Sequence, residues 1–404
     1  MRTEAGYKEA EIRRIRRLRD RELTVACLFL CALLFLILGI LSITPGGITR
    51  FYRPVFIFIA VFSLYRYYPL QSSRWQLILG LYYFIIYICR QITGHSTETF
   101  ISHELFILFF ILAAGRRWSR REINLILDSV IFSCDVQAAV VLISNSFLLH
   151  AGSQQDIHYL WISTNRNPIA FAIVPGAVAS LLKLIYCSKG WKTGLLRGYW
   201  IISFLLCTYD VFAIGCRSAF YSLGLGMACI VWERVKRTRN QAEKIIQELI
   251  IIILVLVVIT LLMRIASGAY SSRLFTLEDS GRKDIWDRAM ELIREKPLFG
   301  GGYDYWEEAG YRIGTHNTFI TFLLEGGAVA AAIAVFHLVF LALEVLGSGS
   351  LIPFAFMVET VLHMMTESGM DYYAYLPLIF CIMLANYSRY QGSMWELFNG
   401  TERR

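Results

Sequence analysis

Apolar runs of about 15 to 25 residues, separated by short polar segments, dominate this sequence. A helix rises about 1.5 Å per residue, so runs of this length cross the roughly 30 Å hydrocarbon layer of a membrane. The pattern predicts an all-α polytopic membrane protein of about twelve transmembrane helices, with one large outer loop that contains an amphipathic helix. The expected spans are 23–43, 51–67, 75–89, 100–114, 123–148, 168–186, 198–214, 218–233, 249–265, 317–345, 351–367 and 372–388.

The composition excludes an ordinary soluble enzyme. Of the 404 residues, 56% are hydrophobic and 17% are charged, whereas about 25% of a typical soluble chain is charged. Most of the nine cysteines fall in apolar runs and none has C-x-x-C spacing, which argues against a disulfide framework and against structural zinc. The first apolar run has no small-residue cleavage site, so we expect a retained anchor rather than a signal peptide.

The net charge of +8 indicates topology rather than a polyanionic partner. The basic run EIRRIRRLRDRE directly precedes the first span, as in an anchor on anionic lipid, and we expect no nucleic acid partner. When this tail is placed inside, the short inner loops carry more Lys and Arg than the short outer loops, so both termini are predicted to be cytoplasmic. The expected organisation is a tail 1–22, nine helices in 23–265, an extracytoplasmic loop 266–315, three helices in 316–388 and a tail 389–404.

The large loop contains the segment SGRKDIWDRAMELIREKP, which predicts a helix that Ser280 caps and Pro297 ends. Its apolar side chains project into one arc and its charged side chains into the opposite arc, as in a helix that lies on a membrane or caps a bundle. Arg282 is the exception, because it projects into the apolar arc. It either reaches lipid phosphate or points inward at a buried anion, next to the N–H groups of the helix N-terminus.

Other polar residues lie at the outer ends of spans. In THNTFITFLLEGG, Thr315 is the expected N-cap, His316 lies in the first helical turn and Glu325 follows deeper in the span. The short turn GCRSAF holds Arg217 where two spans meet, and an arginine fixed there is well placed to bind phosphate. Each of these residues also fits a structural or interfacial role. TNRNPIAF places Arg166 and Asn167 at the same outer level.

Taken together and in this order, these segments resemble the O-antigen ligase/polymerase superfamily of bacterial membrane glycosyltransferases. The matching segments are TNRNPIAFAI (164–173), GCRSAF (215–220), GRKDIWDRAMELIREKPLFGGGYDYW (281–306) and THNTFITFLLEGG (315–327). The resemblance is good over roughly residues 155–345 and rests on topology elsewhere. Cys216 stands where the family commonly has serine or threonine, so a hydroxyl contact at that position is in doubt.

The resemblance implies transfer of a glycan from a polyprenyl-pyrophosphate carrier to an acceptor sugar or lipid-linked acceptor, on the outer face of the bacterial cytoplasmic membrane. By position, Arg217 and Arg282 would bind the pyrophosphate and His316 would be the base. Two guanidinium groups can stabilise the leaving group without a metal or cofactor, and one displacement would invert the anomeric centre. Histidine is suited to accept a hydroxyl proton near neutral pH. The possible supporting residues are Asn317, Glu325, Arg166 and Asn167.

Two other functions fit parts of the pattern. A metal-dependent membrane glycosyltransferase would favour clustered carboxylates in an early outer loop, and TPGGITRFYR has none. A polysaccharide transporter or flippase would use acids within the membrane, for which the candidates are Asp128, Asp135, Asp210 and Glu359, with His363. No inverted repeat supports that alternative. The sequence does not separate a ligase from a polymerase.

Overall fold

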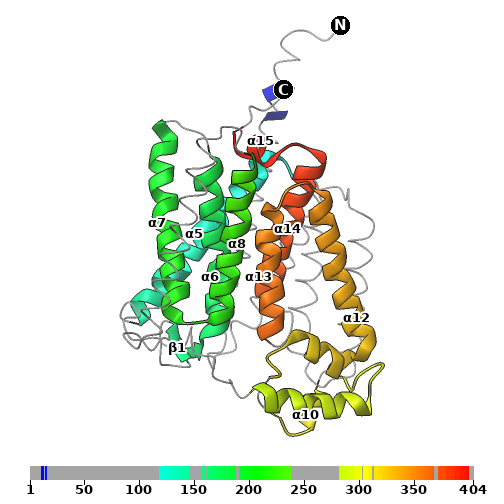
Figure 1. The fold of residues 1–404 in the computed structure, drawn as a ribbon. Helices are drawn as coiled ribbons and strands as arrows, with labels where there is room; N and C mark the ends of the chain where they lie inside the picture. Colours follow the sequence, from blue (N-terminus) through cyan, green and yellow to red (C-terminus); the bar gives the residue numbers. More distant parts are fainter. Residues whose placement is uncertain are drawn as a thin grey trace.

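The computed structural model describes residues 118–145, 156–159, 162–187, 191–237, 282–302, 304–311, 314–367 and 372–399, together with 11, 12, 14 and 15 of the tail. Seven of the twelve expected spans fall in these ranges, and each corresponds to a helix (Figure 1). They are α5 (Arg120–Ser144), α6 (Arg166–Tyr186), α7 (Trp191–Ile214), α8 (Arg217–Arg237), α12 (Thr318–Gly347), α13 (Ile352–Thr366) and α14 (Tyr372–Tyr390). The other five expected spans, the cap at Ser280 and the count of twelve lie outside the described residues.

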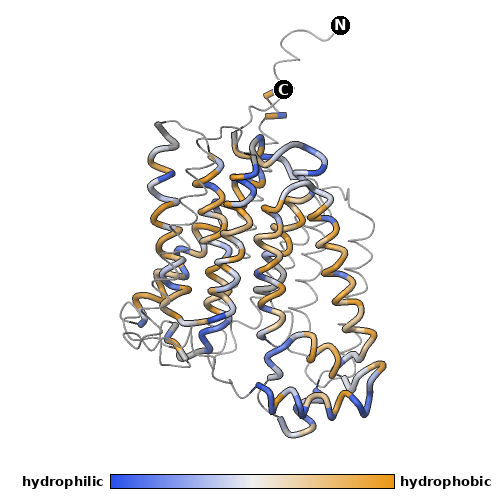
Figure 2. The backbone as a smooth tube through the Cα atoms, in the orientation of Figure 1, coloured by the Kyte–Doolittle hydropathy of each residue, from blue (hydrophilic) through white to orange (hydrophobic). Residues whose placement is uncertain are grey.

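Four helices among the described residues are long and apolar enough to cross a membrane: α5, α6, the Gly194–Ile214 part of α7, and α12. Figure 2 shows that hydrophobic residues predominate along these upright helices. Helix α5 begins after the polar residue Ser119, whose side chain accepts from the backbone N–H of Glu122 while the Glu122 side chain accepts from the N–H of Ser119. This capping box satisfies backbone groups that the first helical turn leaves without intrahelical partners.

Helix α6 lies at the centre of the bundle and packs on α5, α7 and α8. Glycine permits the closest approach: a Cβ on Gly176 would lie 2.3 Å from the Cβ of Cys134. Helix α13 packs against α8 and α14, and a Cβ on Gly226 of α8 would lie 3.2 Å from the carbonyl oxygen of Ala355. Because the Cβ position of Gly226 is also 3.3 Å from Val178 of α6, helices α6, α8 and α13 pack side by side.

Two of the acids considered for a transporter have structural partners. The ammonium of Lys183, which is buried, lies 3.1 Å from the Asp128 carboxylate and donates to the side chain of Asn124 at 2.8 Å. Asp135 accepts a hydrogen bond of 2.6 Å from the hydroxyl of Ser203. Both acids therefore connect neighbouring helices.

A short antiparallel hairpin departs from the all-α expectation. Strand β1 (Asp156–Tyr159) pairs with β2 (Ile162–Asn165). Ile157 of β1 is buried in the main hydrophobic core. Asn145, the C-cap of α5, exchanges two hydrogen bonds with the backbone of His158, so the hairpin is fixed to α5 as it leads into α6.

At one end of the bundle, α10 (Arg282–Glu295) lies across the axes of the long helices, opposite the end that holds α15 (Met394–Asn399) (Figure 1). The predicted amphipathic helix is present and ends before Pro297. Ala289 and Ile293 are buried in a small second core with Trp306, from α11 (Tyr305–Glu308), and Leu324 of α12. The charged residues Asp284, Asp287, Arg288, Glu291, Arg294 and Glu295 are exposed.

Residues 297–302 bind the backbone of α12 where that helix is broken, and we call this arrangement the glycine clasp. Gly327 has φ 65° and ψ −165°, which interrupts α12. The N–H groups of Ala328 and Val329 donate to the carbonyls of Pro297 and Leu298, at 2.8 and 3.3 Å. In the other direction, the N–H groups of Gly301 and Gly302 donate to the carbonyls of Leu324 and Glu325, at 2.8 and 3.1 Å.

The clasp requires glycine at two positions. A Cβ on Gly327 would lie 2.2 Å from the carbonyl carbon of Leu298, and one on Gly300 would lie 2.4 Å from that of Glu325. Both glycines also have positive φ, which side chains disfavour. The motifs PLFGGG and LLEGG thus form two halves of one contact, and that contact fixes α10 to α12.

Candidate functional site

Glu367, the residue that ends α13, is the centre of the site. Its backbone N–H donates to the carbonyl of His363 at 2.9 Å, and its carbonyl accepts from the hydroxyl of Thr318 at 2.8 Å. Its side chain is only 10% exposed. Because both backbone groups are bonded, the carboxylate has a fixed position between α12 and α13.

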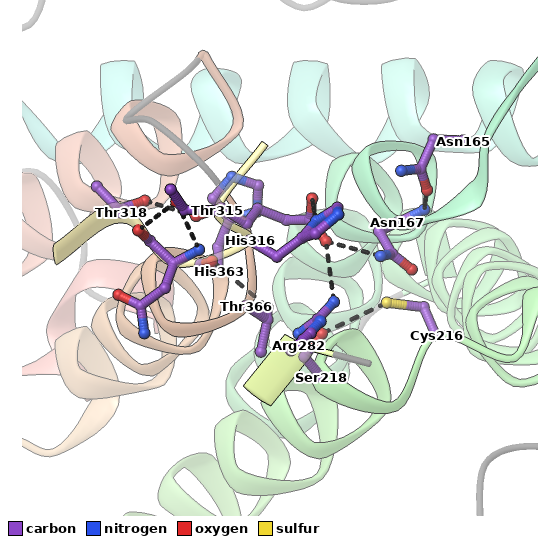
Figure 3. Close-up of polar contacts among 12 residues, drawn as sticks. Asn165, Asn167, Cys216, Ser218, Arg282, Thr315, His316, Thr318, His363 and Thr366 are labelled. Atoms are coloured by element: carbon purple, nitrogen blue, oxygen red, sulfur yellow. Dashed lines mark hydrogen bonds and ion pairs between the residues drawn. The ribbon is translucent and has the colours of Figure 1, made fainter. Parts of the chain in front are cut away.

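Side chains from three different elements converge on this carboxylate (Figure 3). Asn167, in the first turn of α6, donates to Oε1 at 2.7 Å. Arg282, the first residue of α10, places Nη2 3.9 Å from the same oxygen. The Nδ1 of His316 lies 3.6 Å from Oε2. The last two distances are those of charge pairs rather than of short hydrogen bonds. Three residues expected at the site from the sequence therefore share one partner.

His316 has a backbone conformation that is unusual for a residue with a side chain. Its φ is 51°, the left-handed region, and it precedes α12 instead of lying in the first turn. The expectation that Thr315 caps this helix is wrong: the side-chain oxygen of Asn317 accepts from the N–H groups of Phe319 and Ile320, at 3.0 and 3.2 Å. An Asn oxygen reaches these N–H groups readily, so the helix begins after residue 317.

Hydrogen bonds around His316 maintain this conformation. The hydroxyl of Thr315 donates to the carbonyl of Asn317 at 3.0 Å and lies 2.7 Å from the hydroxyl of Thr321. The indole N–H of Trp286, on α10, donates to the carbonyl of Thr315 at 2.9 Å. Helix α10 thus contributes Arg282 and also fixes the backbone next to His316.

The first turn of α6 supplies the side-chain amide of Asn167 to the site. Asn165 ends β2 and caps α6, since its side-chain oxygen accepts from the N–H of Asn167 at 3.0 Å. The intervening Arg166 is buried, and its Nη1 would be 3.9 Å from a Cβ on Gly215 in the turn between α7 and α8. Arg166 therefore lies against this turn, while Asn167 bonds to Glu367.

Arg217 is half-buried and begins α8 immediately after that turn. The adjacent Cys216 is buried, and burial raises the pKa of its thiol, which Glu367 raises further and Arg166 lowers. Cys216 is thus a neutral thiol close to both charges. Its Sγ lies 3.5 Å from the Oγ of Ser218, so a hydroxyl is present two residues after the position where the family pattern has one.

Glu325 lies further along α12, at the glycine clasp. It is eight residues after Asn317, which corresponds to about 12 Å along a helix. It is buried, and its backbone carbonyl binds Gly302. Glu325 therefore helps to attach the α10 segment to α12, and it does not belong to the group around the carboxylate of Glu367.

The aromatic residues of the loop are partly used in packing. Trp306 is buried and stacks on Tyr311, with ring centroids 4.2 Å apart and planes at 17°. The hydroxyl of Tyr305 donates to Glu295 at 2.9 Å, and the ammonium of Lys296 lies 4.5 Å from its ring centroid. Burial and the Glu295 hydrogen bond raise the pKa of Tyr305. Trp306 therefore contributes to the packing of the second core.

Glu367 is a site residue that the sequence pattern alone does not single out. It was included in the expected span 351–367, and an acid at the outer end of a span was the available signal. Among the described residues, no group of three or more His, Cys, Asp or Glu side chains is arranged to hold a metal ion. The site therefore consists of a carboxylate, an imidazole, an amide and arginines at one end of the bundle.

Comparison with known families gives one match. Residues 202–335 match the family model described as O-antigen ligase. This range contains Arg217, Arg282 and His316, whereas Asn167 and Glu367 lie outside it. No curated protein matches the chain.

Proposed function

From the membership of the O-antigen ligase/polymerase superfamily that this match supports, we propose that the chain is a membrane glycosyltransferase of surface polysaccharide assembly. It transfers a glycan from a polyprenyl-pyrophosphate carrier to a hydroxyl of an acceptor sugar or a lipid-linked acceptor. The site faces the outer side of the bacterial cytoplasmic membrane, and both termini are cytoplasmic. The reaction requires no metal ion and inverts the anomeric centre.

One observation carries the proposal. Arg282 and His316, which the resemblance assigns to the pyrophosphate and to the base, lie within 4 Å of one buried carboxylate although they belong to different elements. A proton acceptor and a cation held this close are suited to act on the two ends of the same displacement.

His316 is the base in this mechanism. Its Nδ1 faces Glu367, so an Nδ1 proton is held there and Nε2 accepts the proton of the acceptor hydroxyl. The hydroxyl oxygen forms a bond to the anomeric carbon as the bond from that carbon to the pyrophosphate oxygen breaks. Glu367 orients the imidazole and stabilises the positive charge that it gains.

The arginines act on the leaving group. Each guanidinium presents N–H groups in a planar fork that matches two phosphate oxygens. Arg282 is held loosely by Glu367 at 3.9 Å, so the donor pyrophosphate competes for it well. In addition, Arg282 begins α10, where backbone N–H groups favour an anion. Arg217 approaches the pyrophosphate from the first turn of α8.

The supporting residues act through these groups. Asn167 holds the carboxylate of Glu367, Asn317 fixes the start of α12 and Arg166 secures the turn that precedes Arg217. Glu325 supports the site through the clasp. These roles concern positioning, so their loss should impair turnover without abolishing it.

A transfer assay in membranes tests the proposal. Wild type, Arg217→Ala, Arg282→Ala and His316→Ala are supplied with polyprenyl-pyrophosphate glycan and acceptor, with EDTA in half of the reactions. We expect newly attached or extended glycan from wild type with and without EDTA, and none from the three folded variants. Arg288→Ala is the matched control, because Arg288 lies on α10 but is exposed and pairs with Glu291.

Other outcomes reject it. Activity that EDTA abolishes contradicts the metal-free mechanism, and active variants contradict the assigned residues. If wild type only moves the lipid-linked glycan across the bilayer, the protein is a transporter.

A further inference from the structure

The glycine clasp presents two large apolar side chains outward. Leu298 is 61% exposed and Phe299 is 75% exposed, whereas Gly302, at the other end of the clasp, is buried. They follow Pro297, which ends the α10 segment, and no Asp, Glu, Lys or Arg occurs in residues 297–302. This tip is therefore purely apolar while the outward face of α10 is charged.

The clasp fixes the tip at a definite depth. Since Val329 and Ala328 donate to its carbonyls, the tip lies beside the break of α12 at Gly327. Gly327 separates the first nine residues of α12, Thr318 to Gly326, from the long upright part that ends at Gly347 (Figure 1). The tip therefore lies beside the start of this upright part.

Exposed apolar residues continue from the tip along α12. Val329 is adjacent to Leu298 through its backbone hydrogen bond and is 42% exposed. No Asp, Glu, Lys or Arg occurs between 326 and 343. Large apolar residues on the outward surface of this helix are Val335, Phe336, Val339, Leu343 and Leu346. Helix α12 is one of the four helices suited to cross a membrane, so this surface faces lipid.

Four hydrogen bonds pair the clasp backbone with α12, which lowers the cost of placing this non-helical segment in hydrocarbon. A non-helical segment is tolerated at membrane depth only where its N–H and C=O groups have protein partners. Here, Pro297 and Leu298 supply carbonyls to α12, and Gly301 and Gly302 supply N–H groups. A water-exposed loop would not need this pairing.

The residues next to the tip, Lys296, Tyr305 and Glu295, are of the types that are common in the headgroup layer of a membrane. Lys296 directly precedes the tip and places its ammonium over the ring of Tyr305, whose hydroxyl donates to Glu295. Cations and tyrosine are typical of the headgroup layer. The sequence from Glu295 to Phe299 therefore passes from headgroup chemistry to hydrocarbon chemistry within five residues.

We propose that Leu298 and Phe299 form a membrane anchor that inserts between the acyl chains of the leaflet on the α10 side of the bilayer. The anchor holds the C-terminal end of α10 against the membrane, while Arg282 at the other end contacts the bundle through Glu367. Helix α10 is thus attached at both ends, once to protein and once to lipid.

Photocrosslinking in native membranes tests the anchor. Phe299 is replaced by p-benzoylphenylalanine, which preserves the aromatic ring, and Glu307, an exposed residue of α11, receives the same replacement as a control. We expect lipid adducts at position 299 at several times the level at position 307. Adducts with another protein at position 299, or equal lipid adducts at both positions, overturn the proposal.

Chemical accessibility provides a second readout that does not require activity. Phe299→Cys and Glu307→Cys are treated in membranes with a water-soluble maleimide, and the labelling of wild type is subtracted. We expect labelling at 307 and little at 299, with labelling at 299 appearing only after denaturation. Rapid labelling at 299 in intact membranes would show a hydrated tip and would contradict the insertion.

Discussion

The Nδ1 of His316 lies 3.6 Å from the Oε2 of Glu367. The backbone segments that carry these two residues are also bonded to each other. Thr318, two residues after His316, donates to the backbone carbonyl of Glu367. The pair is therefore held by side chains and by backbone together. In the proposed mechanism, this carboxylate orients His316 through Nδ1 and leaves Nε2 to accept the proton of the acceptor.

Replacing Glu367 by glutamine tests this relationship. We expect Glu367→Gln to lower kcat on the order of 100-fold, since the neutral amide no longer stabilises a protonated imidazole. The KM for the donor should change much less. Steady-state transfer kinetics measure both quantities. Glu344→Gln, which removes a carboxylate paired with Arg389 at the other end of the bundle, should leave them unchanged.

Replacing Arg282 by lysine separates charge from geometry. Arg282→Lys keeps the cation but loses the planar fork, so we expect the KM for the donor to rise about tenfold, a loss of about 1.4 kcal/mol. Titration of the donor measures the change. An unchanged KM in this variant would mean that Arg282 does not bind the pyrophosphate. Arg288→Lys on the exposed face of α10 should behave as wild type.

Gly327→Ala should destabilise the protein strongly. The φ of 65° and ψ of −165° are essentially restricted to glycine, and the new Cβ would overlap the backbone of Leu298. We expect a loss of about 3 kcal/mol or more in the free energy of unfolding. Thermal unfolding in detergent detects it. Gly224→Ala is the control, because nothing lies within 4 Å of its Cβ position on α8 and alanine favours helix.

Trp286→Phe removes the hydrogen bond from α10 to the carbonyl of Thr315 while keeping most of the packing. We expect the free energy of unfolding to fall by only about 1 kcal/mol. Transfer should fall more clearly, because the backbone of His316 loses a restraint. Trp232→Phe, at a tryptophan that is 63% exposed on α8, should affect neither property. Equal activity of the two variants would contradict the positioning role of Trp286.

The long helices were predicted well from the sequence because their apolar runs end at polar residues. The expected span 168–186 is observed as α6, Arg166–Tyr186, and the expected span 317–345 as α12, Thr318–Gly347. The length of an apolar run is a local property of the sequence, so it predicts a membrane-spanning helix without knowledge of tertiary contacts. The hairpin of β1 and β2 was missed because two strands of four residues give little periodic signal.

The site was only partly predictable. His316, Arg282 and Asn167 each stand out where an apolar pattern is interrupted, and these residues meet in the structure. Glu367 does not stand out, because its importance arises from tertiary contacts between α6, α10, α12 and α13. The clasp was hidden for a similar reason: glycine motifs indicate tight backbone, and which two backbones meet depends on the fold.

The clasp also predicts which parts of the segment between α10 and α12 tolerate changes in length. Glycines 300 to 302 and the break at Gly327 close a ring of backbone that includes α11 and His316. Within this ring, Gly310 lies on an exposed turn with open space around it. Homologous chains should therefore differ in length near residue 310, while the spacing from Arg282 to Gly302 and from Thr315 to Gly327 stays constant.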